Sequence, residues 1–230
     1  GPTGSVGPTG SVGPTVRLRH NRVELALHEL RSGEGPVLLL LHGLGEASPA
    51  ALPDRLGSWT GPVRALDFTG HGRSSVPAGG GYTCEILMGD VDVALAHTGP
   101  ATLLGRGLGA YVALLAAGGR PQMVHGAILD DGPGLAGGGP VPASPRILML
   151  PAASGVGVPD PFALAELSAD IRPPDYAAGF VRQATHLSGL ADPVVVCARI
   201  RPPWLEAVVG EPGVVEAPLE QALEMFARSD

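Results

Sequence analysis

The strongest constraint on the fold is the alternation along the chain of short apolar runs with segments whose apolar residues recur at helical spacing. VLLLL at 37–41 is a continuous apolar run, which is typical of a strand covered on both faces. The segment 84–97 instead places Leu87, Val91 and Leu95 on one face of a helix. Repeated strand and helix units predict a mainly parallel β-sheet with helices on both faces, an α/β fold. Ligands of such sheets bind outside the carboxyl ends of the strands.

The remaining elements follow from the same patterns. VRLRH and VELALHEL predict a hairpin, and further strands are predicted at VRALDF, ATLLG, HGAILDDG, VVVCARI and GVVEAP. Two helices are expected to start near Asp160-Pro161 and Asp175, which are typical helix start signals. Two more helices are predicted from the apolar stripes Leu108, Val112, Leu115 and Leu219, Leu223, Phe226.

Composition limits the class of partner. The chain has 230 residues, 44% of them hydrophobic, which suits one domain with a substantial core. The net charge of −7 and the scattered basic residues disfavour nucleic acid and anionic membranes as partners. No apolar run reaches the roughly 18 residues that cross a bilayer. Cys84 and Cys197 fit no disulfide or zinc pattern. We therefore expect a soluble, cytoplasmic protein that binds a small molecule, with no metal ion and no cofactor.

The first fifteen residues differ from the rest. Residues 1–15, GPTGSVGPTGSVGPT, have Gly at every third position, but five triplets are too few for a collagen triple helix. We interpret them as a flexible leader and place the folded domain at 16–230. Within that domain, residues 133–160 are rich in Gly, Pro and Ala, a composition typical of loops.

Three stretches together resemble the α/β-hydrolase family. LLLLHGLG at 38–45 is similar to the family's strand that ends in His-Gly, where the following loop gives a backbone N–H to the oxyanion hole. DFTGHGRSS at 67–75 resembles the family's Asp-x-x-Gly-x-Gly-x-Ser segment, and GRGLG at 105–109 stands where the family has its G-x-S-x-G nucleophile elbow. Their order and spacing match the family over nearly all of the chain after Val16. The resemblance places a cap or lid at about 133–192.

The resemblance implies a Ser, Cys or Asp nucleophile at position 107, where this chain has Gly107. Gly105 and Gly109 match the small residues that the elbow needs where its helix packs against its strand. Glycine reaches positive φ without the steric cost that a nucleophile's side chain carries there. We therefore predict an elbow that keeps its turn and lacks its attacking atom.

The other two members of the family's triad are also missing from their usual places. The strand VVVCARI runs into RPPW without an Asp, so Asp131, after the preceding strand, is a candidate acid by position only. The family has its base just after the last strand, but this chain has no His after His186. His42 and His71 match motif positions that are structural or pocket-lining in the family. For His186, in the predicted lid, we favour a solvent-facing or capping role over catalysis.

Main-chain donors are the part of the site that we expect to persist. The N–H groups of Leu44 and Leu108 are predicted to form an oxyanion-hole-like site, because donors at a helix N-terminus do not depend on the side chain at position 107. Arg106 is expected either to bind a carboxylate or phosphate or to pair with Asp130 or Asp131. The candidates for the pocket wall are His42, Gly43, Arg106 and Trp204.

Three functions fit these residues. The first is an α/β-hydrolase-fold protein without a standard Ser-His-Asp triad, with a lidded pocket for a small apolar or carbonyl-containing molecule, either non-hydrolytic or a degenerate hydrolase. The second is a hydrolase of small esters in which a His and Asp131 activate water. The third is a non-catalytic interaction scaffold, since a fold alone does not fix a function. Ordinary serine hydrolysis is not expected, because losing both nucleophile and base costs orders of magnitude in rate.

Overall fold

The computed structural model of the chain describes residues 13–142 and 157–228. The strands are Thr15–His20 (β1), Val23–Arg31 (β2), Val37–Leu41 (β3), Val63–Leu66 (β4), Ala101–Arg106 (β5), Val124–Asp130 (β6), Val194–Val196 (β7) and Val214–Glu216 (β8). The helices are the short 3₁₀ helix Asp54–Leu56 (η1), Cys84–Thr98 (α1), Leu108–Gly119 (α2), Pro161–Ala169 (α3), Pro174–Leu187 (α4), Pro203–Val209 (α5) and Leu219–Ala227 (α6).

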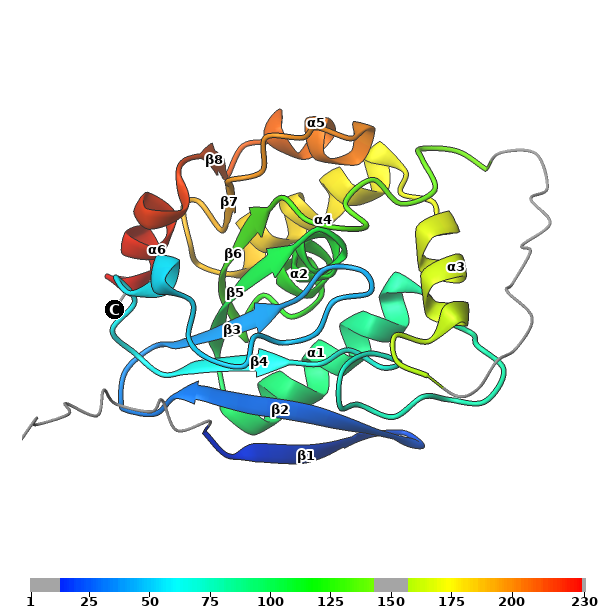
Figure 1. Cartoon of the computed structure of the whole chain (residues 1–230). Helices are drawn as coiled ribbons and strands as arrows, with labels where there is room; N and C mark the ends of the chain where they lie inside the picture. Colours follow the sequence, from blue (N-terminus) through cyan, green and yellow to red (C-terminus); the bar gives the residue numbers. More distant parts are fainter. Residues whose placement is uncertain (1–12, 143–156, 229–230) are drawn as a thin grey trace, which may run out of the picture.

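The strands form one sheet in the order β1-β2-β4-β3-β5-β6-β7-β8. β1 pairs antiparallel with β2, and β2 antiparallel with β4, whereas the neighbours from β4 to β8 pair in parallel. Figure 1 shows the antiparallel hairpin at one edge of the sheet, with β7 and β8 towards the other. The predicted fold class, a mainly parallel sheet with helices, is confirmed.

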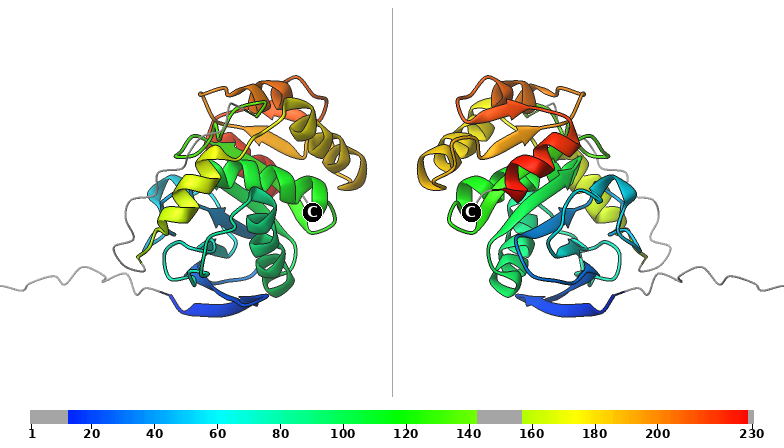
Figure 2. Two further views of the ribbon diagram at one scale, coloured as in Figure 1. Left: turned by 90° about the vertical axis from the view of Figure 1, so that its right-hand side faces the viewer. Right: turned by 90° about the vertical axis from the view of Figure 1, so that its left-hand side faces the viewer.

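The side chains of the central strands alternate between two apolar cores. In β3, Leu39 and Leu41 belong to the core that includes residues of α1, α2, α4 and α5, whereas Leu38 and Leu40 belong to the core formed with η1 and α6. The two views of Figure 2 show helices on both sides of the sheet. Because both faces are covered, β3 reads as an unbroken apolar run rather than an alternating one.

Most predicted elements are confirmed, with differences near the C-terminus. The hairpin turns at Asn21, which has a positive φ of 53°. Helix α3 begins at Pro161, and the side chain of Asp160 caps it by accepting the N–H of Phe162. β7 is shorter than the predicted VVVCARI and ends at Val196. The sequence did not predict α5, a short helix that begins at the second of two consecutive prolines, Pro203.

The predicted leader and lid lie partly outside the described residues. Residues 1–12 and 143–156 are not among the described residues, so the leader and the extent of a lid stay predictions. The strand β1 begins at Thr15, one residue before the predicted start of the domain. Within the predicted lid region, α4 contacts α2 and α5 and buries Ala177, Val181 and Ala184. Helix α4 therefore belongs to the helical layer on that face of the sheet.

Within residues 13–142 and 157–228, no helix combines the length and the apolar character that a membrane span requires.

Candidate functional site

The turn between β5 and α2 is a sharp strand-to-helix corner. Gly107 lies at its centre with φ 55° and ψ −118°, in a region of positive φ that glycine reaches without steric cost. A Cβ on Gly105 would lie 2.1 Å from the carbonyl oxygen of Gly109, and a Cβ on Gly109 would lie 2.4 Å from the carbonyl oxygen of Leu41. The first turn of α2 therefore packs directly on the ends of β3 and β5, and both flanking glycines are required for that contact.

Backbone atoms fill the space into which a side chain at position 107 would project. A Cβ on Gly107 would lie 2.1 Å from the carbonyl oxygen of Pro133 and 2.4 Å from the carbonyl carbon of Gly132. Such distances are far below van der Waals contact. We name residues 132–134 the Pro133 loop. No side chain fits at position 107 while this loop stays where it is.

The two main-chain donors predicted for the site lie together and share one acceptor. The N–H groups of Leu44 and Leu108 donate to the carbonyl oxygen of Pro133, at 3.0 and 2.9 Å. Two convergent N–H groups on one carbonyl oxygen are the arrangement with which an oxyanion hole holds its substrate. Here the chain's own carbonyl takes that place. The sequence reading missed Pro133, whose only signal is the Gly-Pro-Gly that follows the two acids at the end of β6.

His42 and His71 tie the loop after β3 to the loop after β4. His42 accepts the N–H of Phe68 at Nε2 and lies 2.7 Å from the carbonyl oxygen of Gly43 at Nδ1. His71 accepts the N–H of Gly45 at Nε2 and lies 3.0 Å from the carbonyl oxygen of Thr69 at Nδ1. These partners fix both rings as neutral Nδ1–H tautomers.

The electrostatics of these two rings agree with their hydrogen bonds. Burial lowers the pKa of His42 to about 4, helped by the neighbouring His71. Burial also lowers the pKa of His71. Because all four ring nitrogens face backbone groups, neither ring offers a free lone pair to a water molecule or a substrate.

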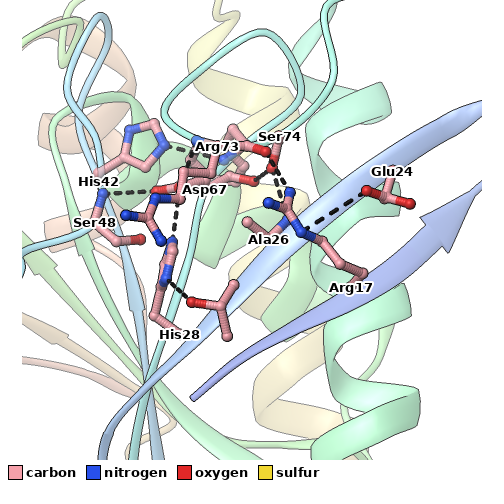
Figure 3. A network of polar contacts seen from close by, with 11 residues as sticks. Arg17, Glu24, Ala26, His28, His42, Ser48, Asp67, Arg73 and Ser74 are labelled. Atoms are coloured by element: carbon pink, nitrogen blue, oxygen red, sulfur yellow. Dashed lines mark hydrogen bonds and ion pairs between the residues drawn. The ribbon is translucent and has the colours of Figure 1, made fainter. Parts of the chain in front are cut away.

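The carboxylate of Asp67, directly after β4, joins the same loops to His28 of β2 (Figure 3). It accepts the N–H groups of Ser48 and Arg73, at 2.8 and 2.9 Å, and Nε2 of His28 lies 2.8 Å from it. Burial opposes its ionisation, but the hydrogen bonds from Arg73, His28 and Ser48 outweigh burial and lower the pKa of Asp67. Asp67 thus holds the end of the loop at 70–73 through the N–H of Arg73.

The acids at the end of β6 are occupied by structural contacts. Asp131, the candidate acid, accepts the N–H groups of Arg199 and Ile200 at 2.9 and 3.0 Å. Asp130 forms an ion pair with Arg55 at 2.7 Å. All seven histidines lie in the described part of the chain, and none of them hydrogen-bonds to either acid there.

Two other predicted site residues, His186 and Trp204, do not line the cavity beside the elbow. His186 is exposed in the last turn of α4. Trp204, in α5, is buried with its ring against Tyr111 and donates its Nε1–H to the carbonyl oxygen of Leu135 at 2.7 Å. Trp204 therefore anchors the chain just after the Pro133 loop.

Of the residues predicted for the pocket wall, Arg106 and His42 line the cavity beside the elbow, whereas Gly43 and Trp204 do not. The cavity has a volume of about 370 Å³ and is lined by Leu40, Leu56 and Leu104. Its charged lining residues are Glu46, Arg55 and Arg106, and His42 also contributes to the wall. Glu46, rather than Asp130 or Asp131, is the partner of Arg106, at 3.5 Å. The other oxygen of Glu46 accepts the N–H of Gly43 at 3.0 Å.

Neither a protein-family model nor a curated protein sequence matches the chain. Solved structures do. The deformylase Nfo from Pseudomonas putida S16 has a TM-score of 0.63 at 14% identity, covering 94% of this chain and 100% of its own. A hydrolase from Pseudomonas aeruginosa PA01 has a TM-score of 0.57 at 22% identity, covering 94% of this chain and 99% of its own. These likenesses, with the strand order above, show that the chain has the α/β-hydrolase fold.

Proposed function

We propose that this protein is a non-hydrolytic member of the α/β-hydrolase fold that binds a small apolar or carbonyl-containing molecule. The observation that carries the proposal is the pair of hydrogen bonds from Leu44 and Leu108 to the carbonyl oxygen of Pro133. A substrate carbonyl would have to displace this internal carbonyl before it could be polarised. A cytoplasmic location, favoured by the two unpaired cysteines, is part of the same proposal.

The chemistry of the surrounding groups supports binding over turnover. Gly107 has no atom with which to attack an ester. His42 and His71 use their ring nitrogens on the backbone, so the water-activating alternative lacks a base next to Asp131. Retained donors without nucleophile and base would leave at most a small fraction of a hydrolase's rate.

A fluorophosphonate probe and a panel of p-nitrophenyl esters test this proposal. The probe reacts with activated serine nucleophiles, so the intact chain should stay unlabelled while a serine esterase in the same tube is labelled fully. Ester turnover should equal that of buffer. Stoichiometric labelling of any serine would refute the proposal. Turnover that the wild-type chain shows and His42→Gln or His71→Gln loses would favour the water-activating hydrolase instead.

A further inference from the structure

The cavity beside the elbow lies beneath the connection from β3 to β4. In that connection, residues 42–62, the only helix is the three-residue η1. Loop residues, rather than a long helix, therefore cover the part of the sheet surface that Leu40 and Leu104 form. Both leucines belong to the core on the η1 and α6 side, and Leu40 keeps 8% of its surface exposed. The cavity is thus an unfilled part of an apolar layer, separate from the space above Gly107.

The charged residues of this cavity are unequally paired. Arg55 is held by Asp130 at 2.7 Å, but the contact between Arg106 and Glu46 is a single 3.5 Å approach. A guanidinium has five N–H donors, so Arg106 keeps most of its donors available to a ligand. Its side chain is 39% exposed, which leaves it open to molecules entering from solvent. Glu46 is engaged on its other oxygen by Gly43, which holds this carboxylate in place.

The pairing of the charged residues makes Arg106 the place for an anion. Arg55 is neutralised by Asp130, whereas Arg106 has only its single 3.5 Å contact with Glu46. His42 adds no charge near neutral pH, because burial lowers its pKa to about 4. A monocarboxylate needs only one such cation, and its two oxygens match the fork of a guanidinium.

We propose that this cavity binds a monocarboxylate with a medium-length apolar tail, with the carboxylate on Arg106 and the tail against Leu40, Leu56 and Leu104. The volume of about 370 Å³ lies at the lower end of the range of small-molecule pockets, which suits a chain of about eight carbons. The inference deepens the proposed function, because it names the class of small molecule and the place where it binds. It rests on the part of the proposed function that assigns binding of a small molecule, and not on the part that excludes hydrolysis.

Isothermal titration of the full chain with sodium octanoate and with 1-octanol tests the ligand class. We expect one octanoate per chain, bound at least about tenfold more tightly than 1-octanol, because only octanoate forms a charge-assisted pair with Arg106. Arg106→Gln should remove this preference. The matched control is Arg120→Gln, which removes an arginine that directly follows α2, pairs with Asp92 of α1 and does not line the cavity. This control should bind octanoate as the wild type does.

A second variant tests the location. Ala47 is an exposed lining residue, so Ala47→Phe narrows the cavity without touching the core. This variant should bind neither ligand, while its thermal unfolding stays close to that of the wild type.

Three outcomes would overturn the inference: no octanoate binding to the wild type, equal affinity for 1-octanol, or unchanged octanoate affinity in Arg106→Gln or Ala47→Phe. Octanoate has no bond to hydrolyse, so this result is independent of the fluorophosphonate experiment. Failure of the octanoate experiment would refute the monocarboxylate ligand and would not affect the proposal that the protein is non-hydrolytic.

Discussion

Gly107 answers two separate steric demands. Its positive φ is one that a side chain adopts only with strain, of the order of 1–3 kcal/mol. The Pro133 loop adds a second demand, because a Cβ here would meet the carbonyl oxygen of Pro133 at 2.1 Å. In a hydrolase elbow, the nucleophile has a side chain despite the backbone strain of its positive φ. At this position both costs would fall on any residue other than glycine.

Installing a serine at position 107 should therefore destabilise the protein rather than create an esterase. We expect Gly107→Ser to lower the free energy of unfolding by at least about 2 kcal/mol more than Gly79→Ser, measured by urea denaturation. Gly79 is the matched control, because its φ is also positive, at 83°, but a Cβ there meets nothing within 4 Å. Equal losses of unfolding free energy in the two variants, or vigorous ester turnover by Gly107→Ser, would contradict the close packing of the Pro133 loop on Gly107.

At the level of elements, the Pro133 loop is positioned by glycine as well. Gly134 has a φ of 79°, and a Cβ on it would lie 2.6 Å from Cβ of Leu44 and 3.2 Å from Cβ of Leu108. The Pro133 loop can therefore pack directly on Leu44 and Leu108 only because position 134 has no side chain. The segment closes the elbow through backbone atoms alone.

Gly134→Ala should lift this loop from its donors. In the wild type, we expect the amides of Leu44 and Leu108 to exchange slowly with deuterium, because both are bonded to Pro133. In Gly134→Ala, both amides should exchange at least about tenfold faster. Gly139→Ala is the control, since Gly139 has a φ of 93° and open space around it. Fast exchange of these two amides in the wild type would show that the loop does not hold its place in solution.

The positions of the strands and helices could be predicted from the sequence. The carbonyl of Pro133 that accepts the N–H groups of Leu44 and Leu108 could not. The apolar run of β3 and the stripe of α1 depend on local periodicity, so the sequence predicted both correctly. The Gly-Pro-Gly of the Pro133 loop indicates a turn, but composition does not reveal where its carbonyl points. The pairing of Arg106 with Glu46 joins residues sixty positions apart, which no local pattern reveals.

For the molecule as a whole, buried neutral histidines couple stability to pH. His42 and His71 join the loops after β3 and β4, and burial lowers the pKa of each. Their unfolded counterparts titrate near pH 6.5, so between about pH 6.5 and pH 4 the unfolded chain binds more protons than the folded one. The stability that these two neutral rings contribute is complete above pH 6.5 and falls as the pH drops towards 4. His20 and Asp67 act outside this window, because Asp90 raises the pKa of His20 and hydrogen bonds lower that of Asp67.

The pH dependence of unfolding should carry the signature of His42. We expect His42 to lower the free energy of unfolding of the wild type by about 1 kcal/mol per pH unit between pH 6.5 and pH 4, with His71 acting in the same direction. The measurement is urea denaturation from pH 7 to pH 4. His42→Gln removes one titrating ring, so it should be less stable at pH 7 but lose less on acidification. His97→Gln, at an exposed position of α1, is the control and should keep the wild-type slope. If His42→Gln kept that slope as well, the ring of His42 would not be held neutral in the folded protein, and its hydrogen bond from Phe68 would not join the two loops in solution.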